Sequence, residues 1–216
     1  MNFKAVIFDM DGTLLDTLQD LADSMNHVLK NLGFPEHPRE AYKYFVGQGM
    51  DILVRKALPS EHLNESLVTQ CIEAMREEYL KNWDRTTRPY PGIPELLDAL
   101  TREKIPMTIL SNKPHDFTLF VAARLLDKWT FPIILGARPG VPKKPDPAGA
   151  LEIAETLKLP PKEILYLGDT GTDMKTATSA GMFPVGALWG FRTASELTAE
   201  GARVLIDRPQ DLLKYF

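Results

Sequence analysis

The sequence is poor in cysteine, histidine and long apolar runs, and each shortage excludes a class of protein. Its single cysteine, Cys71, cannot form an intramolecular disulfide, and its helix-like neighbours favour a small buried side chain there. The 4 histidines lack the spacing of metal ligands. No apolar stretch approaches the ~20 residues of a membrane-spanning helix, and no signal-peptide pattern precedes the first apolar run. We therefore expect a soluble cytoplasmic protein that does not enter a membrane.

A surplus of basic residues is also missing. The chain has 25 Lys and Arg against 29 Asp and Glu, which gives a net charge of -4. Because a nucleic-acid backbone binds to a basic surface, this balance argues against nucleic acid as the main partner. The 216 residues are enough for one large domain, or for a core with a modest insertion.

Apolar runs and amphipathic stretches alternate along most of the chain. Short buried strands are predicted at residues 5–8, 107–110, 133–135, 164–167, 184–188 and 204–206. Helical patterns at residues 93–102, 117–126, 148–157 and 174–180 alternate with the later strands, whereas residues 17–83 contain amphipathic helices and no convincing strand. This order predicts an α/β fold in which residues 1–16 and 84–216 form a parallel-sheet core with residues 17–83 as a helical insert.

Two carboxylates follow the first predicted strand. Asp9 and Asp11 come at its end, and Gly12 and Thr13 follow at once. Ligands bind at the carboxyl ends of strands in open α/β sheets, and two acids in a dry site need a cation or a proton between them. The alternative is an ordinary turn, in which Asp and Gly are common.

Three more polar clusters are placed at predicted strand ends or helix starts. They are Ser111-Asn112-Lys113, Lys143-Lys144-Pro145-Asp146-Pro147 and Gly168-Asp169-Thr170-Gly171-Thr172-Asp173. Parallel strands end at one edge of a sheet, so the clusters can meet. Their carboxylates suit Mg²⁺, and their hydroxyl, amide and ammonium donors suit phosphoryl oxygens. One carboxylate can then attack phosphorus while a second moves protons.

Simpler interpretations stay open for several of these residues. Ser111 and Asn112 are both of a type that caps helices. The alternative for Lys144 is a solvated loop lysine, the interpretation that we give to Lys143. The Pro-Asp-Pro that follows Lys144 favours a role in the site.

The order and spacing of the clusters resemble the haloacid dehalogenase (HAD) superfamily and, within it, the phosphatases. The signature of that superfamily is D-x-D-G-T, a strand-end Ser or Thr, Lys before Pro, and G-D-x-x-x-D. Here it corresponds to residues 9–13, Ser111, Lys144 and residues 168–173. The resemblance implies a Rossmann-like core and a Mg²⁺-dependent phosphomonoester hydrolase with an aspartyl-phosphate intermediate.

The resemblance also implies a role for each site residue. Asp9 is expected to be the nucleophile and a metal ligand, and Asp11 the general acid/base whose backbone carbonyl binds the metal. Asp169 is expected to be a third ligand, and Asp173 to bind through water or to support the ligands. The groups expected to hold the phosphoryl group are Gly12, Thr13, Ser111, Asn112 and Lys144.

The insert resembles the small helical cap (C1 type) of the same superfamily, which closes over the site and reads the leaving group. Residues 45–58, 88–92 and 189–191 are similar to segments of phosphoglycolate phosphatases. We therefore expect a small phosphorylated metabolite, 2-phosphoglycolate or a similar ester, as substrate of a monomer or homodimer. Gly47, Gly49 and Arg55 are expected near its leaving group; for Arg55 a solvated helix face is the alternative.

Other functions on the same scaffold remain as alternatives: a β-phosphoglucomutase-like phosphosugar mutase and a pyrophosphatase. Mutases of this kind carry a Ser-Arg pair after a glycine in the cap, and the segment Gly47-Gln48-Gly49-Met50 has neither. A dehalogenase uses no Mg²⁺ and has no use for Asp11. A non-catalytic relative is expected to have lost at least one of the core acids or Lys144, and all are present.

Overall fold

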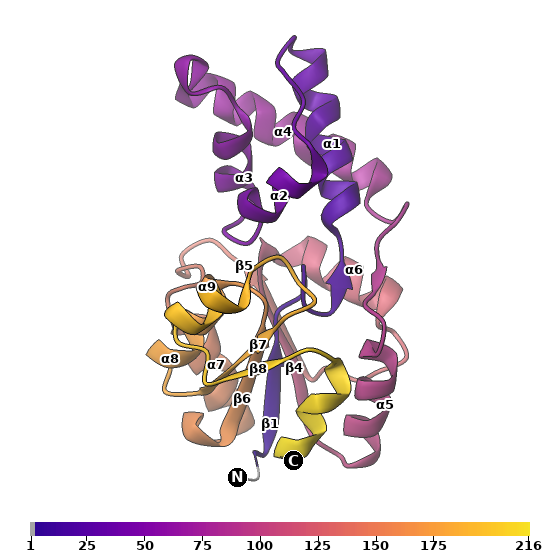
Figure 1. Cartoon of the computed structure of the whole chain (residues 1–216), viewed down its shortest axis with the longest axis vertical. Helices are drawn as coiled ribbons and strands as arrows, with labels where there is room; N and C mark the ends of the chain where they lie inside the picture. The colour runs from indigo at the N-terminus through magenta and orange to yellow at the C-terminus, as the bar shows by residue number, and fades with distance from the viewer. Residues whose placement is uncertain (1–2) are drawn as a thin grey trace. The chain divides into compact units, whose positions relative to one another are not determined.

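The computed structural model describes residues 3–216, which divide into two compact units. The first consists of the residues up to Leu15 together with Pro89–Phe216, and the second is Asp16–Arg88. Two short strands, β2 (Leu15–Asp16) and β3 (Arg88–Pro89), pair where the chain passes from one unit to the other (Figure 1).

The first unit is built on a six-stranded parallel sheet with the strand order β5-β4-β1-β6-β7-β8. Its strands are β1 (Ala5–Phe8), β4 (Met107–Pro114), β5 (Ile133–Ala137), β6 (Ile164–Gly168), β7 (Phe183–Ala187) and β8 (Val204–Ile206). Phe8 is in register with Ile109 and Leu167, so the residues that follow β1, β4 and β6 leave the sheet at one edge. The predicted α/β class with a Rossmann-like parallel sheet is confirmed.

Helices cover both faces of this sheet, which explains why every side chain of β1 and β6 is buried. They are α5 (Ile93–Arg102), α6 (His115–Leu125), α7 (Ala148–Leu157), α8 (Gly171–Ser179) and α9 (Ala194–Ala199), with short 3-10 turns at Pro161–Glu163 and Pro209–Tyr215. Figure 1 shows α7 and α8 on one side of the strands and α5 on the other. On the α7 side, Ile153 shares an apolar cluster with Ile7 and Tyr166.

Strand β4 is longer than the sequence predicts. Its apolar run ends at Leu110, but the extended backbone continues to Pro114. The register with β5 shifts between these two residues, and an irregular stretch of this kind has no apolar periodicity to announce it. Pro114 is the N-cap residue of α6, so Ser111 and Asn112 do not cap that helix, and this alternative is excluded.

The second unit contains four helices: α1 (Leu18–Asn31), α2 (Arg39–Phe45), α3 (Met50–Ala57) and α4 (Glu65–Asn82), with a 3-10 turn at Ser60–His62. Helix α1 buries one apolar stripe at three- and four-residue spacing and packs against α2 and α4. Asn64 caps α4 by accepting a hydrogen bond from the backbone N–H of Leu67 at 2.9 Å. Within residues 3–216, none of the helices combines the length and apolarity needed to span a bilayer.

A buried carboxylate ties the two ends of the second unit together. Asp20, in the first turn of α1, is 1% exposed. It accepts five hydrogen bonds, at 2.7 to 3.1 Å, from the backbone N–H groups and hydroxyls of Thr86 and Thr87. A buried charge requires such partners, because an unsatisfied one is costly in an apolar interior. The start of the first helix is therefore fixed to the segment that leaves the unit.

Candidate active site

Asp9 stands where β1 ends, at the carboxyl edge of the sheet. Its backbone N–H donates to the carbonyl of Leu167 in β6 at 3.0 Å. Its Oδ1 accepts from the backbone N–H of Met10 at 2.7 Å and lies 2.9 Å from Nζ of Lys144. Among residues 3–216, both hydrogen bonds to this carboxylate fall on Oδ1. Oδ2 is therefore the oxygen that can meet a ligand.

Lys144 joins two carboxylates inside the fold. Its side chain is 2% exposed, and Nζ lies 2.9 Å from Oδ1 of Asp9 and 2.7 Å from Oδ1 of Asp173. Burial lowers the pKa of Lys144, but the carboxylates of Asp173 and Asp9 outweigh it and hold the pKa well above its ordinary value. The amine therefore stays charged, and Lys144 is not a solvated loop lysine.

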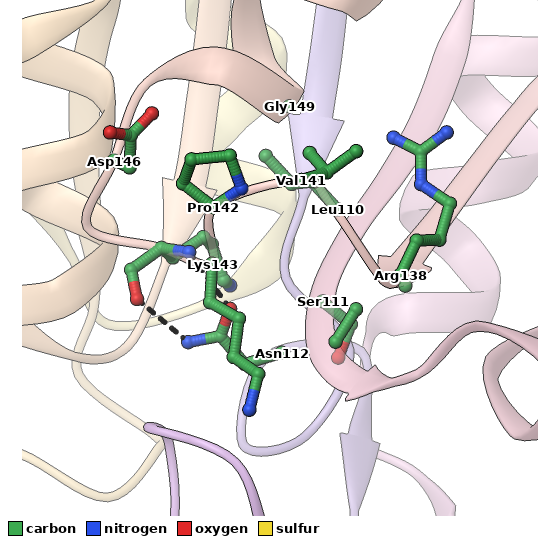
Figure 2. A pocket seen from close by; sticks show the side chains of 12 residues that line it. Leu110, Ser111, Asn112, Arg138, Val141, Pro142, Lys143, Asp146 and Gly149 are labelled. Atoms are coloured by element: carbon green, nitrogen blue, oxygen red, sulfur yellow. Dashed lines mark hydrogen bonds between the residues drawn. The ribbon is translucent and has the colours of Figure 1, made fainter.

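The backbone of Lys144 is held in turn by Asn112. Its Oδ1 accepts from the Lys144 backbone N–H at 2.9 Å, and its Nδ2 donates to the Lys144 carbonyl at 3.0 Å. Dashed lines mark the hydrogen bonds of Asn112 in Figure 2. A pocket lined by Leu110, Arg138 and Val141 among others borders this pair (Figure 2). The Asn112 side chain, which the sequence assigns to the phosphoryl group, thus also fixes the lysine.

Asp169 follows β6 and is fully buried. Its Oδ1 accepts from the Thr13 hydroxyl at 2.9 Å, and its Oδ2 accepts from the Phe191 backbone N–H at 2.8 Å. Gly12 has a φ of +88°, and a Cβ built there would lie 2.3 Å from Oδ2 of Asp169. Only glycine fits such a close approach, so Gly12 and Thr13 both shape the position of Asp169.

Asp173 stands in the first turn of α8. Its Oδ2 accepts from the Thr170 hydroxyl at 2.6 Å and from the Thr170 backbone N–H at 3.1 Å, which completes a capping box. This box starts the helix at Gly171, three residues before the predicted start at Met174. The other oxygen of this carboxylate, Oδ1, binds Nζ of Lys144.

Asp9, Asp169 and Asp173 form a compact acidic trio, each offering an oxygen within 4.8 Å of the others. Burial raises the pKa of Asp9 well above its ordinary value, and Asp173 and Asp169 add to that rise while Lys144 opposes it. Burial, reinforced by Asp173, raises the pKa of Asp169 to about 7. Three carboxylates with one ammonium group leave excess negative charge, and their hard oxygens fit a divalent cation such as Mg²⁺.

Asp11 lies outside this trio, beside a lysine to which the sequence analysis gives no role. Its Oδ2 is 2.9 Å from Nζ of Lys113, and the two side chains are 13% and 5% exposed. Its Oδ1 is buried without a hydrogen-bond partner among residues 3–216. In the sequence, Lys113 directly follows the predicted site residues Ser111 and Asn112. This position could have indicated that Lys113 also belongs to the site. The pairing itself joins residues 102 positions apart.

The other residues predicted to hold a phosphoryl group share this edge. Ser111 is buried in β4, and its Oγ accepts from the Lys113 backbone N–H at 3.2 Å. A hydroxyl that accepts one hydrogen bond keeps its own hydrogen available to donate. The roles of Gly12, Thr13, Ser111, Asn112 and Lys144 toward a phosphoryl group stay predictions.

The three residues predicted to recognise the leaving group belong to the second unit. Gly47 and Gly49 have φ angles of +109° and +93°, which glycine adopts without strain. The guanidinium of Arg55 lies 3.2 Å from Asp51 and 2.6 Å from Glu65. Arg55 thus already binds two carboxylates of its own unit, and its contact with a substrate stays a prediction.

Comparison with known proteins gives consistent matches. The family model described as haloacid dehalogenase-like hydrolase matches residues 6–187. A phosphoglycolate phosphatase of Pseudomonas putida is 32% identical over 218 residues, which cover 97% of this chain and 78% of that protein. One of Aquifex aeolicus is 31% identical over 211 residues, or 98% and 95% of the two chains. A crystal structure described as a predicted phosphoglycolate phosphatase from Haemophilus somnus is 29% identical and superposes with a TM-score of 0.91, covering 99% of this chain and 98% of that one.

Proposed function

The chain belongs to the haloacid dehalogenase-like hydrolases and is a phosphatase, and we propose that it is a magnesium-dependent phosphomonoester hydrolase acting on 2-phosphoglycolate or a similar small anionic ester. The observation that carries this proposal is the buried pairing of Asp9 with Lys144 beside two further carboxylates. The names of relatives that align over nearly the whole chain support phosphoglycolate as the substrate.

The acidic trio is the proposed metal site. Asp9 and Asp169 would hold the ion through their carboxylates, with Asp173 binding through water or supporting the ligands. Asp11 would contribute its backbone carbonyl. When bound there, a divalent cation would neutralise charge on the carboxylates and the phosphoryl oxygens and would make phosphorus more electrophilic. Gly12 and Thr13 assist indirectly, because they set the position of Asp169.

In the first chemical step, Asp9 is the nucleophile. Its Oδ2 forms a bond to phosphorus as the bond from phosphorus to the ester oxygen breaks. Asp11 donates a proton to the departing oxygen, so that the leaving group departs as an alcohol. Lys144 holds the other oxygen of Asp9 and keeps it oriented. The products of this step are the alcohol and a phosphoryl group on Asp9.

In the second step, water replaces Asp9 on phosphorus. The carboxylate of Asp11, now without its proton, takes one from the water as the water oxygen attacks. The bond between phosphorus and Oδ2 breaks, which releases inorganic phosphate and restores the Asp9 carboxylate. Ser111, Asn112 and Lys144 hold the phosphoryl oxygens through both steps by their hydroxyl, amide and ammonium donors.

The helical unit is proposed to act as a cap that selects the ester. Core groups that bind only the phosphoryl group cannot distinguish one leaving group from another, so groups around the leaving oxygen must do so. The cap consists of residues 17–83. Within it, Gly47, Gly49 and Arg55 are the residues proposed to contact the leaving group.

Phosphate release from a panel of esters tests the proposal. The panel contains 2-phosphoglycolate, β-glucose 1-phosphate and pyrophosphate, each with Mg²⁺ and with excess chelator. We expect the highest kcat/KM for 2-phosphoglycolate and no activity in chelator. Conversion of β-glucose 1-phosphate to glucose 6-phosphate without phosphate release identifies a mutase instead, and a preference for pyrophosphate identifies a pyrophosphatase. Full activity in excess chelator contradicts the proposed dependence on Mg²⁺.

A further inference from the structure

The site contains two buried ammonium groups with different partners. Lys144 bridges Asp9 and Asp173, whereas Nζ of Lys113 lies 2.9 Å from Oδ2 of Asp11. The ring of Phe117 in α6 covers the Lys113 ammonium from another side, with 5.5 Å between Nζ and the ring centroid. A cation held between a carboxylate and an aromatic face is largely removed from water, as its 5% exposure shows.

The backbone that carries Lys113 is fixed on several sides. Its N–H donates to Oγ of Ser111 and its carbonyl accepts from the Thr118 hydroxyl, both at 3.2 Å. Gly136 of β5 approaches the same carbonyl so closely that a Cβ there would lie 2.7 Å from the oxygen. These contacts hold the backbone of Lys113 in place, so its side chain extends from a fixed point and its ammonium stays close to Asp11.

Whatever oxygen Asp11 protonates lies within reach of Lys113. A general acid must come to about 2.6–3.2 Å from the oxygen that it serves. Lys113 is already 2.9 Å from the same carboxylate. If a short ester carries a second anionic group one carbon from the ester oxygen, that group also arrives beside Asp11. The ammonium of Lys113 attracts that anionic group.

A carboxylate of the substrate needs a cation once it is enclosed, because an unpaired buried charge is costly. Lys144 binds two core carboxylates and, in the proposed mechanism, the phosphoryl oxygens, whereas the carboxylate that Lys113 binds, that of Asp11, is the one that serves the leaving oxygen. We propose that Lys113 is a specificity-determining residue of the sheet unit that acts beside the cap, and that its ammonium binds a carboxylate one carbon from the ester oxygen. This inference rests on the proposed function, since it requires Asp11 to serve the leaving oxygen.

A pair of esters that differ in one group tests the proposal. 2-Phosphoglycolate has the carboxylate, and 2-hydroxyethyl phosphate has a neutral hydroxymethyl group in its place. We expect Lys113→Met to lower the kcat/KM ratio of the first ester over the second at least about 30-fold, the effect of removing one partner of a buried charge pair. Both esters are measured on one preparation, so partial misfolding affects both alike and cancels in the ratio.

Two further variants serve as controls. Lys113→Arg keeps the charge and should retain most of the preference, whereas Lys143→Met removes an exposed neighbouring lysine and should leave the ratio unchanged. If Lys113→Met turns over neither ester, the ratio is read as dissociation constants of the two esters on an Asp9→Asn background, with and without Lys113→Met.

The outcomes separate the inference from the function on which it rests. Equal losses for both esters mean that Lys113 only neutralises Asp11, and they overturn the inference. An equal drop in the ratio for Lys143→Met also overturns it, because the effect is then one of general charge. A wild-type protein that releases phosphate from no ester overturns the proposed function together with the inference.

Discussion

Charged groups in the two units differ in their exposure and in their partners. In the sheet unit, Lys144 is 2% exposed and binds carboxylates from two other segments, Asp9 and Asp173. In the helical unit, Arg55 is 34% exposed and binds Asp51, four residues away, and Glu65, which is 81% exposed. Loss of one partner from a buried pair leaves an uncompensated charge, whereas water and salt screen an exposed pair.

The buried charge of the helical unit makes the difference clearer. Asp20 is satisfied by five hydrogen bonds from Thr86 and Thr87 and needs nothing more. In the acidic trio of the sheet unit, in contrast, burial raises the pKa of Asp9 and of Asp169, and the neighbouring carboxylates add to that rise. Buried charge without a full set of partners indicates a site where a ligand binds. In this protein such charge lies at the carboxyl edge of the sheet, and we expect the reaction to occur there.

The largest effect is expected for Asp9→Asn. An amide is a poor nucleophile and a weaker metal ligand, so we expect kcat to fall by at least about 10⁴ while the fold is kept. Steady-state phosphate release and circular dichroism check the two parts. Hydrolysis within about tenfold of the wild type contradicts a covalent role for Asp9.

Asp11→Asn should come next, with kcat lowered by about 10²–10⁴, the usual contribution of a positioned general acid/base. Its backbone carbonyl is unchanged, so the affinity for Mg²⁺ should change less than the rate. Titration of activity with Mg²⁺ measures both. A collapse of metal affinity without a loss of single-turnover rate shows that Asp11 has been given the wrong role.

The substitution Asn112→Ala distinguishes two roles of the Asn112 amide, which are to hold the backbone of Lys144 and to bind the phosphoryl group. If its main task is to hold the Lys144 backbone, kcat should fall about 10–100-fold, as for residues that orient a metal ligand, while KM for 2-phosphoglycolate stays near the wild-type value. A rise in KM with kcat unchanged assigns the amide to binding the phosphoryl group instead.

The acidic trio should make stability depend on pH when no metal is present. The pKa of Asp169 is raised by burial and by Asp173 to about 7, above the ~3.9 of an unfolded chain. The native state then binds more protons than the unfolded state between these values, so stability falls as pH rises through this window. We expect Tm in chelator to fall by a few °C between about pH 5 and about pH 7, and Mg²⁺ to remove the loss. A pH-independent Tm contradicts this.

Arg55→Gln should have the smallest effect. Its ion pairs are exposed, so we expect Tm to change by less than about 2 °C. We expect KM for 2-phosphoglycolate to rise less than about tenfold, and KM for p-nitrophenyl phosphate, which has no carboxylate, to stay the same. If Arg55→Gln lowers the preference for 2-phosphoglycolate as much as Lys113→Met does, the helical unit and not the sheet unit recognises the substrate carboxylate.

Regular elements of the fold could be predicted from the sequence because their periodicity is strong. The strands at 164–167 and 204–206 and the helices at 93–102 and 148–157 are found at or within one residue of the predicted bounds. Helix α9 was missed, although Thr193, which accepts from the backbone N–H of Glu196, gives the capping signal T-x-x-E. Caps rather than apolar periodicity decide where short helices begin.

The site was only partly predictable. Residues at strand ends could be singled out, since parallel topology brings those ends together. The partners of individual side chains could not, because the contacts of Lys113 with Asp11 and of Asn112 with Lys144 depend on register and on the irregular end of β4. Sequence therefore predicts which residue types gather at the edge, and the structure decides which of them bind one another.

The stereochemical course at phosphorus shows whether Asp9 carries the phosphoryl group during turnover. The measurement uses a phosphorothioate monoester and water that are isotopically labelled so that the released thiophosphate is chiral. Each in-line displacement inverts phosphorus, so transfer to Asp9 and then to water predicts net retention of configuration. Net inversion means that water attacks the ester directly, and it rules out a phosphoryl group on Asp9.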